Sequence, residues 1–202
     1  MELIVATKNK KKLQEIDELL KGLGLKIRSL ADYPDAPRII ENGKTFSENA
    51  VKKAVKIARF TKKLTLGEDS GLCIDALGGK PGVFSSRFSG KSKSDAKNNE
   101  KVLRLLKRVP LRDRRAHYVC AVALADENGL IAVVEGKCHG VIGFEEKGYS
   151  GFGYDPLFVI PKFKKTFAQL GIRIKHTMSH RFHALTKARK IVQKYIEKQG
   201  LS

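Results

Sequence analysis

The beginning of the chain places the tightest constraint on the fold, because an apolar run, an amphipathic stretch and a second apolar run follow one another there. Residues 2–7 (Glu-Leu-Ile-Val-Ala-Thr) are typical of a buried strand. Residues 10–22 place apolar side chains on one helical stripe, and Gly22 and Gly24 indicate where it ends. Residues 25–30 predict a second strand. A strand-helix-strand order favours parallel pairing, so we expect an α/β fold with a partly parallel sheet.

The middle of the chain predicts two more helices and a short strand. Residues 45–48 (Thr-Phe-Ser-Glu) match a capping box, which predicts a helix to about residue 62 with an apolar face of Val51, Ala54, Val55 and Ala58. A short strand at 64–67 leads into an acidic pair, and residues 78–92 are expected to form a loop. Residues 94–108 predict a basic amphipathic helix, in which the side chains of Val102, Leu105 and Leu106 point toward the core.

The second half predicts a hairpin and a closing helix. Strands at 116–125 and 130–138 are joined at Asn128-Gly129, a strong hairpin signal. A further strand is expected at 157–160, and a helix at 180–198. Since no repeat or long linker interrupts the pattern, we expect residues 1–202 to form a single domain.

Composition excludes several classes of protein. Hydrophobic residues make up 42% of the chain, too many for a disordered protein. The longest apolar runs are far shorter than the roughly 20 residues that a membrane helix needs. Since the N-terminus also lacks a signal pattern, we expect a cytoplasmic protein with no membrane partner. The three cysteines form no CxxC pair, and the strand-like surroundings of Cys73 and Cys120 favour buried thiols over metal ligands or disulfides.

The charge balance points to a polyanionic partner. Forty Lys and Arg residues face 21 Asp and Glu residues, which gives a net charge of +19. Such a field attracts a nucleotide or a nucleic acid. The lysines are spread along the whole chain, however, which is also typical of a solvated surface, so charge alone does not choose between these interpretations.

Two stretches in the first half carry candidate chemistry. Thr7-Lys8-Asn9-Lys10-Lys11-Lys12 follows the first strand and opens a helix, and a helix N-terminus suits a phosphate. It lacks the glycines of a P-loop. Glu68-Asp69, with Glu41 upstream, is expected at a strand end, where carboxylate oxygens suit Mg²⁺. A solvated helix start and a turn cap are the structural alternatives. Asp75 is expected in a strand with a structural role.

Two stretches in the second half carry groups that suit a base. Glycines in Ser150–Pro156 allow a close backbone approach, and its aromatic residues Phe152 and Tyr154 can stack on a ring. Ser179-His180-Arg181 follows Lys175 and offers donors to a phosphate or a base carbonyl. The structural alternatives are a tight aromatic turn and a helix N-cap.

Taken in order, these stretches resemble the inosine triphosphate pyrophosphatase (Ham1-like) family over residues 3 to about 192. The matching motifs are Thr7-x-Asn9-x-x-Lys12, Glu41-x-Gly43-x-Thr45-Phe46-x-Glu48-Asn49-Ala50-x-x-Lys53-Ala54, Asp69-Ser70-Gly71-Leu72, Pro81-Gly82-Val83-x-Ser85-x-Arg87, Gly151-Phe152-Gly153-Tyr154-Asp155-Pro156 and Ser179-His180-Arg181-x-x-Ala184-Leu185. Most members carry a second Asp where this chain has Glu68, and Gly is common where it has Lys8 and Lys11.

The resemblance implies a fold, an activity and a set of site residues. The fold would be an elongated mixed sheet with flanking helices, in two lobes around a central substrate cleft, assembled as a homodimer. The activity would be Mg²⁺-dependent hydrolysis of ITP, dITP and XTP to the monophosphate and pyrophosphate. Asp69 would be the catalytic residue, and Glu41 and Asp69 would bind the metal, with Glu68 as a further candidate. Substrate contacts would come from Thr7, Lys8, Asn9, Lys10, Lys11, Lys12, Ser70, Phe152, Gly153, Tyr154, Asp155, Lys175, His180 and Arg181.

Two other functions compete with this interpretation. A Maf-like pyrophosphatase would act on modified pyrimidine nucleotides instead. A basic nucleic-acid-binding module would use the positive surface, but no recognised binding motif supports it and the acids at 41, 68 and 69 argue against it. We therefore expect purine nucleoside triphosphates as substrates and no specific nucleic-acid partner.

Overall fold

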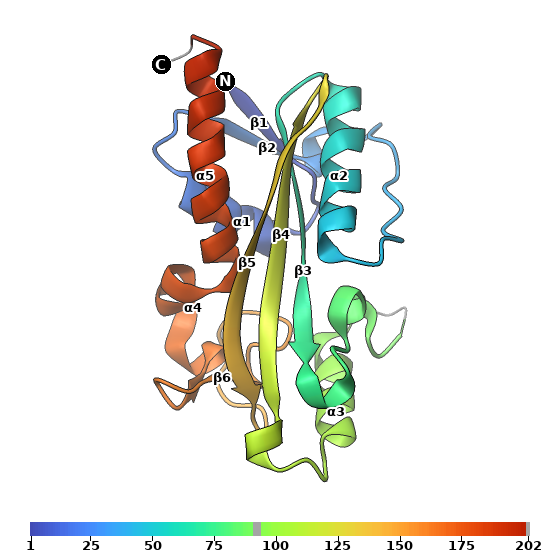
Figure 1. Cartoon of the computed structure of the whole chain (residues 1–202), viewed down its shortest axis with the longest axis vertical. Helices are drawn as coiled ribbons and strands as arrows, with labels where there is room; N and C mark the ends of the chain where they lie inside the picture. The colour runs from blue at the N-terminus through green and yellow to red at the C-terminus, as the bar shows by residue number, and fades with distance from the viewer. Residues whose placement is uncertain (91–93, 201–202) are drawn as a thin grey trace. The chain divides into compact units, whose positions relative to one another are not determined.

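The structure, a computed structural model, describes residues 1–90 and 94–200. Within them it confirms the α/β class, because seven strands form one mixed sheet in the order β2-β1-β3-β4-β5-β6-β7 (Figure 1). The strands are β1 (Glu2–Val5), β2 (Lys26–Ser29), β3 (Thr65–Ile74), β4 (Arg115–Asp126), β5 (Gly129–Ile142), β6 (Phe158–Ile160) and β7 (Lys165–Thr166). The helices are α1 (Lys10–Leu20), α2 (Phe46–Thr61), α3 (Asp95–Leu105), α4 (Phe167–Met178) and α5 (His180–Lys198).

The chain divides into two compact units. Unit 1 contains Met1–Asp69, Cys120–Gly136 and Arg181–Ser202, and unit 2 contains Ser70–Val119 and Lys137–His180. The boundary falls within β3, β4 and β5, so each of these strands contributes residues to both units. The single domain and the two lobes around a substrate cleft stay predictions.

The predicted β-α-β opening is confirmed in unit 1. Strand β1 pairs in parallel with β2, with Leu3 opposite Ile27, and in parallel with β3, with Ile4 opposite Thr65. Helix α1 connects β1 to β2 and buries Ile16 and Leu20, two of the residues on its predicted stripe. Two parallel strands that follow one another in the sequence need a crossover such as α1, because a tight turn can join only antiparallel strands.

Strand β1 has an apolar core on each of its faces. Leu3 and Val5 point to one face, where they pack in a cluster with residues of α1 and α5. Ile4 and Ala6 point to the other, where Ile57 of α2 covers them. This alternation is the period of two that a strand imposes. In Figure 1, α2 and α5 accordingly lie on opposite sides of the strands of unit 1.

Unit 2 has its own core, which is rich in aromatic rings. It buries side chains of β3, α3, β4, β6 and α4. The ring of Tyr118 lies 4.6 Å from that of Phe158, and Phe158 lies 5.3 Å from Phe167. These separations fall in the range of favourable aromatic contacts.

The predicted helix at 45–62 is confirmed, but its buried face differs from the prediction. Thr45 caps α2 by accepting from the backbone N–H of Glu48. The Glu48 carboxylate bonds the N–H of Lys44 rather than that of Thr45. The buried face includes Ala54 and Ala58, as predicted, together with Ala50 and Ile57, whereas Val51 and Val55 are only half-buried.

Other differences lie in unit 2. Leu105, predicted to point inward, is 46% exposed, whereas Val102 of α3 and its C-cap residue Leu106 are buried, as predicted. The predicted loop at 78–92 contains a 3-10 helix over Gly82–Arg87, and its residues 91 and 92 lie outside the described residues. Asp75 does not lie in a strand but begins a 3-10 helix. Helix α4 was not predicted.

Two further predictions concern thiols and membranes. Cys120 is fully buried, as predicted, whereas Cys73 is only half-buried. No helix in the described part of the chain is long and apolar enough to cross a membrane.

Candidate active site

The acidic pair lies where α2 packs most closely on β3. A Cβ at Gly67 would approach the backbone oxygen of Ala50 to 2.2 Å, so only glycine permits this contact. Glu68 and Asp69 follow directly and lie inside β3, not at a strand end as predicted. Both are buried. The close packing sets these two acids beside polar groups of α2.

Lys53 of α2 is the centre of this acidic cluster. Its Nζ lies 3.0 Å from Oδ1 of Asp69, 3.1 Å from Oε2 of Glu41 and 3.1 Å from the backbone oxygen of Glu68. Burial lowers the pKa of Lys53, but the neighbouring carboxylates, led by Asp69, outweigh burial and raise it. Lys53 is therefore a fixed positive charge among three acids.

The surroundings of Asp69 shift its pKa, which is typical of a group that exchanges a proton during a reaction. Burial raises the pKa of Asp69, while the positive charges of Lys53 and Lys12 oppose the rise and the charge of Glu68 adds to it. A carboxylate with a raised pKa is a stronger base than an exposed one. Perturbed acids of this kind cluster at functional sites.

Asn49 joins Asp69 to the segment that carries Glu41. Its Nδ2 donates to Oδ2 of Asp69 at 3.1 Å, and its Oδ1 accepts from the N–H of Gly43 at 2.8 Å. A Cβ at Gly43 would meet that Oδ1 at 2.7 Å, so the segment comes this close only because it has glycine there. Asn49 thus orients a catalytic candidate and a metal-binding candidate together.

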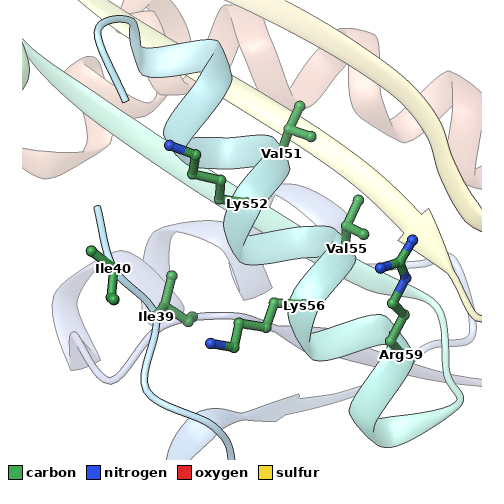
Figure 2. A pocket seen from close by; sticks show the side chains of 7 residues that line it. All are labelled: Ile39, Ile40, Val51, Lys52, Val55, Lys56 and Arg59. Carbon is green, nitrogen blue, oxygen red and sulfur yellow. The ribbon is translucent and has the colours of Figure 1, made fainter. Parts of the chain in front are cut away.

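The exposed face of α2 ties down the same segment. Nζ of Lys56 donates to the backbone oxygen of Arg38, and Nζ of Lys52 donates to Oδ1 of Asn42, both at 2.8 Å. A groove remains between segment and helix (Figure 2), lined by Ile39, Ile40, Val51, Lys52, Val55, Lys56 and Arg59. Neither Asn49 and Lys53 nor the acids Glu41, Glu68 and Asp69 line this groove, so it is not the acidic site.

Glu68 belongs to a second ion-pair network. Its carboxylate lies 2.7 Å from Nζ of Lys12 and 3.0 Å from Nη2 of Arg181, and Sγ of Cys120 lies 3.3 Å away. Arg181 also pairs with Glu15 of α1. Arg181 is buried, so in this structure its guanidinium joins two carboxylates within unit 1.

The predicted phosphate loop is built around the N-cap of α1. Oδ1 of Asn9 accepts from the N–H groups of Lys11 and Lys12. Oγ1 of Thr7 accepts from the N–H of Asn9. The side chains of Lys8, Lys10 and Lys11 are exposed, whereas Lys12 turns to Glu68. Much of the predicted positive charge is therefore presented to solvent at a helix N-terminus.

The stretch Ser150–Pro156, the glycine-aromatic loop, lies in unit 2, and Asp155 holds its conformation. Its Oδ2 accepts from the N–H of Phe152 at 3.0 Å and from Nζ of Lys175 at 2.8 Å. A Cβ at Gly151, whose φ is +85°, would lie 2.1 Å from that oxygen. Asp155 and Lys175 are both buried, so this ion pair fixes the loop to the interior of unit 2.

Aromatic groups surround this buried pair. Nζ of Lys175 lies 4.5 Å from the centre of the Phe152 ring, which is half-buried. Tyr118 stacks on His180 with ring centres 4.6 Å apart and planes 11° apart, and its hydroxyl lies 3.5 Å from Oδ1 of Asp155. A cation, an imidazole and a half-buried aromatic ring together suit a planar polar ring.

The predicted site residues thus form two clusters, one in each unit. Unit 1 brings together the three acids and Lys12, and also holds Arg181. Unit 2 brings together the residues of the glycine-aromatic loop, Lys175 and His180, and Ser70 is half-buried in β3. Sequence reasoning gave no role to Lys53, Asn49, Glu15 and Tyr118. Helical spacing from Asn49 to Lys53 could have indicated one shared face.

The acidic cluster contains oxygen donors of the kind that bind a hard divalent cation. Glu41 and Asp69 offer carboxylate oxygens, which Mg²⁺ prefers, and in this structure both face the ammonium group of Lys53, whereas the carboxylate of Glu68 faces Lys12 and Arg181. Among the described residues, no group of three His, Cys, Asp or Glu side chains has the geometry of a metal site. The donor set fits a cation that shares its ligands with a substrate and with water.

Comparison with known proteins shows similarity to one family over most of the chain. A sequence model of the Ham1 family matches residues 3–191. A dITP/XTP pyrophosphatase of Desulforamulus reducens is 48% identical over 98% of this chain and 100% of its own length. A dITP/XTP pyrophosphatase of Halalkalibacterium halodurans is 49% identical over 91% of this chain and 95% of its own.

Solved structures show the same fold. The structure of a HAM1 protein from Coxiella burnetii superposes with a TM-score of 0.88 at 39% identity, over 96% of this chain and 99% of that one. A nucleoside-triphosphatase / dITP/XTP pyrophosphatase from Mycobacterium abscessus gives a TM-score of 0.77 at 38% identity, over 93% and 97% of the two chains. The resemblance inferred from the motifs is therefore confirmed over nearly the whole chain.

Proposed function

The chain belongs to the Ham1 family, and from this membership we propose that it is a nucleoside-triphosphate pyrophosphohydrolase that removes purine nucleotides foreign to the normal pool. Its substrates would be dITP, XTP and ITP, and its products the monophosphate and pyrophosphate. The observation that carries the proposal is the 48% identity to a dITP/XTP pyrophosphatase over 98% of this chain.

The basic loop at the start of α1 would bind the triphosphate. Thr7 and Asn9 shape the helix N-terminus, and Lys8, Lys10 and Lys11 present exposed charge beside it. Backbone N–H groups and ammonium groups at such a terminus stabilise phosphate oxygens and the charge that develops on a leaving pyrophosphate. Lys12, paired with Glu68, links this loop to the acidic cluster.

Glu41 and Asp69, with Glu68 as a further candidate, would hold Mg²⁺, whose charge would offset that of the triphosphate. Asp69 would accept a proton from the water that attacks the α-phosphorus. Its buried position raises its pKa, which suits that role, and Asn49 and Lys53 orient its two oxygens. The positive charge of Lys53 opposes the effect of burial on the pKa of Asp69 and so favours the ionised carboxylate.

The cluster of unit 2 would bind the base. Phe152 offers a half-buried ring for stacking, and Lys175 and His180 are donors suited to the 6-oxo group of inosine and xanthosine. Adenine carries an amino group at that position, which would leave buried donors unpaired and so weaken binding. The proposed contacts of Ser70, Gly153, Tyr154, Asp155 and Arg181 rest on the family resemblance.

The test is a substrate panel with purified protein. Pyrophosphate release is measured with ITP, dITP, XTP, GTP, ATP, dUTP and m5UTP, each with Mg²⁺ and with EDTA. We expect Mg²⁺-dependent release from the first three that exceeds release from GTP and ATP by about a hundredfold. Preferential release from dUTP or m5UTP would indicate a pyrimidine-directed pyrophosphatase, and no release from any nucleotide would refute the proposal.

We also propose that the protein is a homodimer, which rests on the family resemblance. Light scattering coupled to size-exclusion chromatography measures the mass directly. A mass close to twice 22.5 kDa is expected, whereas a mass near 22.5 kDa would refute the dimer.

A further inference from the structure

The loop that would contact the base is held from its outer side by α3. Gly153 lies at the centre of this loop and has a φ of +64°. Its N–H donates to Oδ2 of Asp95 at 2.8 Å, and its carbonyl oxygen accepts from Nδ2 of Asn99 at 3.2 Å. Both polar groups of one residue are thus bound by side chains of the same helix.

The spacing of Asp95 and Asn99 explains why one helix can make both contacts. Residues four apart lie on the same face of a helix. Asp95 is the first residue of α3, after the N-cap Ser94, and Asn99 follows one turn later and is buried. Nδ2 of Asn99 also donates to Glu146 at 3.0 Å, which fixes the orientation of the amide.

The neighbours of Gly153 are fixed by other contacts. The hydroxyl of Tyr154 donates to the backbone oxygen of Ser85 at 2.7 Å. The N–H of Phe152 is bound by Asp155. The residue between them is glycine, the most flexible residue type, and it has no side chain to pack. The bonds from Asp95 and Asn99 therefore supply order at the position where the loop itself has least.

We infer that Asp95 and Asn99 are positioning residues for base recognition, which hold Gly153 so that Phe152 presents its ring to the base. This inference rests on the proposed function and names residues to which that function gives no role. Without these bonds the loop populates its binding conformation for a smaller fraction of the time. The apparent affinity for the nucleotide falls in proportion to that fraction, whereas turnover of the bound nucleotide is unchanged.

The test separates base binding from triphosphate binding. Asp95→Ala and Asn99→Ala are each assayed for kcat and KM with ITP, and for inhibition by inorganic tripolyphosphate, which has no base. We expect KM for ITP to rise about tenfold, kcat to stay within about threefold, and the tripolyphosphate inhibition constant to stay unchanged. The double variant should raise KM by less than the product of the two single effects, because both side chains hold one residue.

Two further variants exclude an effect of helix stability or charge. Asp95→Asn removes the charge at the start of α3 but keeps an oxygen acceptor, so KM should return close to the wild-type value. Glu100→Ala removes an acid from an exposed position of the same helix and should leave KM unchanged. Thermal melting of each variant shows whether it is folded at the assay temperature, and if one alanine variant is not, the other alanine variant decides.

The outcomes distinguish this inference from the proposed function. If the wild-type protein does not release pyrophosphate from ITP, the proposed function fails. If the wild type is active but neither alanine variant changes KM, the positioning role is refuted. An equal loss of ITP and tripolyphosphate binding would refute it as well, because the effect would then not be specific to the base.

Discussion

The ammonium group of Lys53 lies 3.0 Å from a carboxylate oxygen of Asp69, and both side chains are buried. Burial disfavours the ionised form of each residue, and each favours the charge of the other. Lys53 also reaches Glu41, so one cation holds together two acids that come from different parts of the sequence. Asp69 and Lys53 can therefore be tested separately, Asp69 for its part in proton transfer and Lys53 for its effect on the pKa of Asp69.

Asp69→Asn should remove most turnover and retain part of the nucleotide binding. An amide cannot accept a proton from water, and loss of a general base costs roughly 10²–10⁴ in rate. The measurement is kcat for pyrophosphate release from ITP, with nucleotide binding followed by calorimetry. Asp75→Asn makes the same charge change at an exposed position and should leave kcat unchanged. Activity of Asp69→Asn close to that of the wild type would rule out its catalytic role.

Lys53→Met should move the acid limb of the pH–rate profile to higher pH. The charge of Lys53 lowers the pKa of Asp69 against the effect of burial, so its loss raises that pKa further. Asp69 must be ionised to accept a proton, so activity should then require a pH that is higher by roughly one unit or more. The profile of kcat/KM from pH 5 to 9 measures this. Lys190→Met, at an exposed position of α5, is the control, and an unchanged acid limb in Lys53→Met would contradict the coupling.

The three thiols should differ in reactivity. Burial raises the pKa of Cys138 to about 11 and holds that of Cys120 well above its usual range, and Cys120 also lies against Glu68. Only the thiolate reacts quickly with disulfide reagents. At pH 8 we expect Cys73, which is half-buried, to react first in the native protein, and all three after unfolding in guanidinium. Mass spectrometry of the labelled peptides identifies the sites, and early labelling of Cys120 would contradict its buried position.

Local signals predicted the elements that local chemistry determines. Thr45 caps α2, and Asn128-Gly129 joins β4 to β5, because a hydroxyl at an N-cap and a flexible pair in a turn act through their nearest neighbours. A similar signal existed for α4, where Thr166 and Gln169 form a capping box. Gly171, with a φ of +80°, interrupts that helix and divides its periodic pattern into pieces too short to stand out.

The location of the acidic pair could not be predicted from local signals. Two carboxylates inside a buried strand break the apolar pattern of a strand, so a strand end was the natural expectation. They are stabilised there by distant residues: Lys12 reaches Glu68 across 56 positions, and Arg181 across 113. The family resemblance indicated which residues matter, but the pairing of Arg181 with Glu15 and Glu68 comes from the structure alone.

Arg181→Met should destabilise the protein more than any surface substitution. It leaves Glu15 and Glu68 buried without the guanidinium that joins them, and breaking a buried pair in this way costs roughly 3–5 kcal/mol. Lys12 still contacts Glu68 in this variant. The free energy of unfolding from urea titrations measures the loss. Adding Glu15→Gln to the variant should recover part of it, because the second change removes a buried charge that has lost the guanidinium of Arg181.

The loss in Arg181→Met should depend on pH in a defined direction. Without the cation, the pKa of a buried glutamic acid in the folded state rises above its unfolded value of about 4.3. The destabilisation is then smallest below that unfolded value and grows as the pH rises through the raised folded value. Unfolding titrations at pH 4 and pH 8 should therefore show a smaller difference from the wild type at pH 4. Arg189→Met is the control on the same helix, because Arg189 donates only to the backbone oxygens of Leu19 and Lys21 in the contacts described, and its loss should cost about 1 kcal/mol at both pH values. Equal losses for Arg181→Met at the two pH values would mean that packing, and not the loss of the cation beside the buried carboxylates, accounts for the effect.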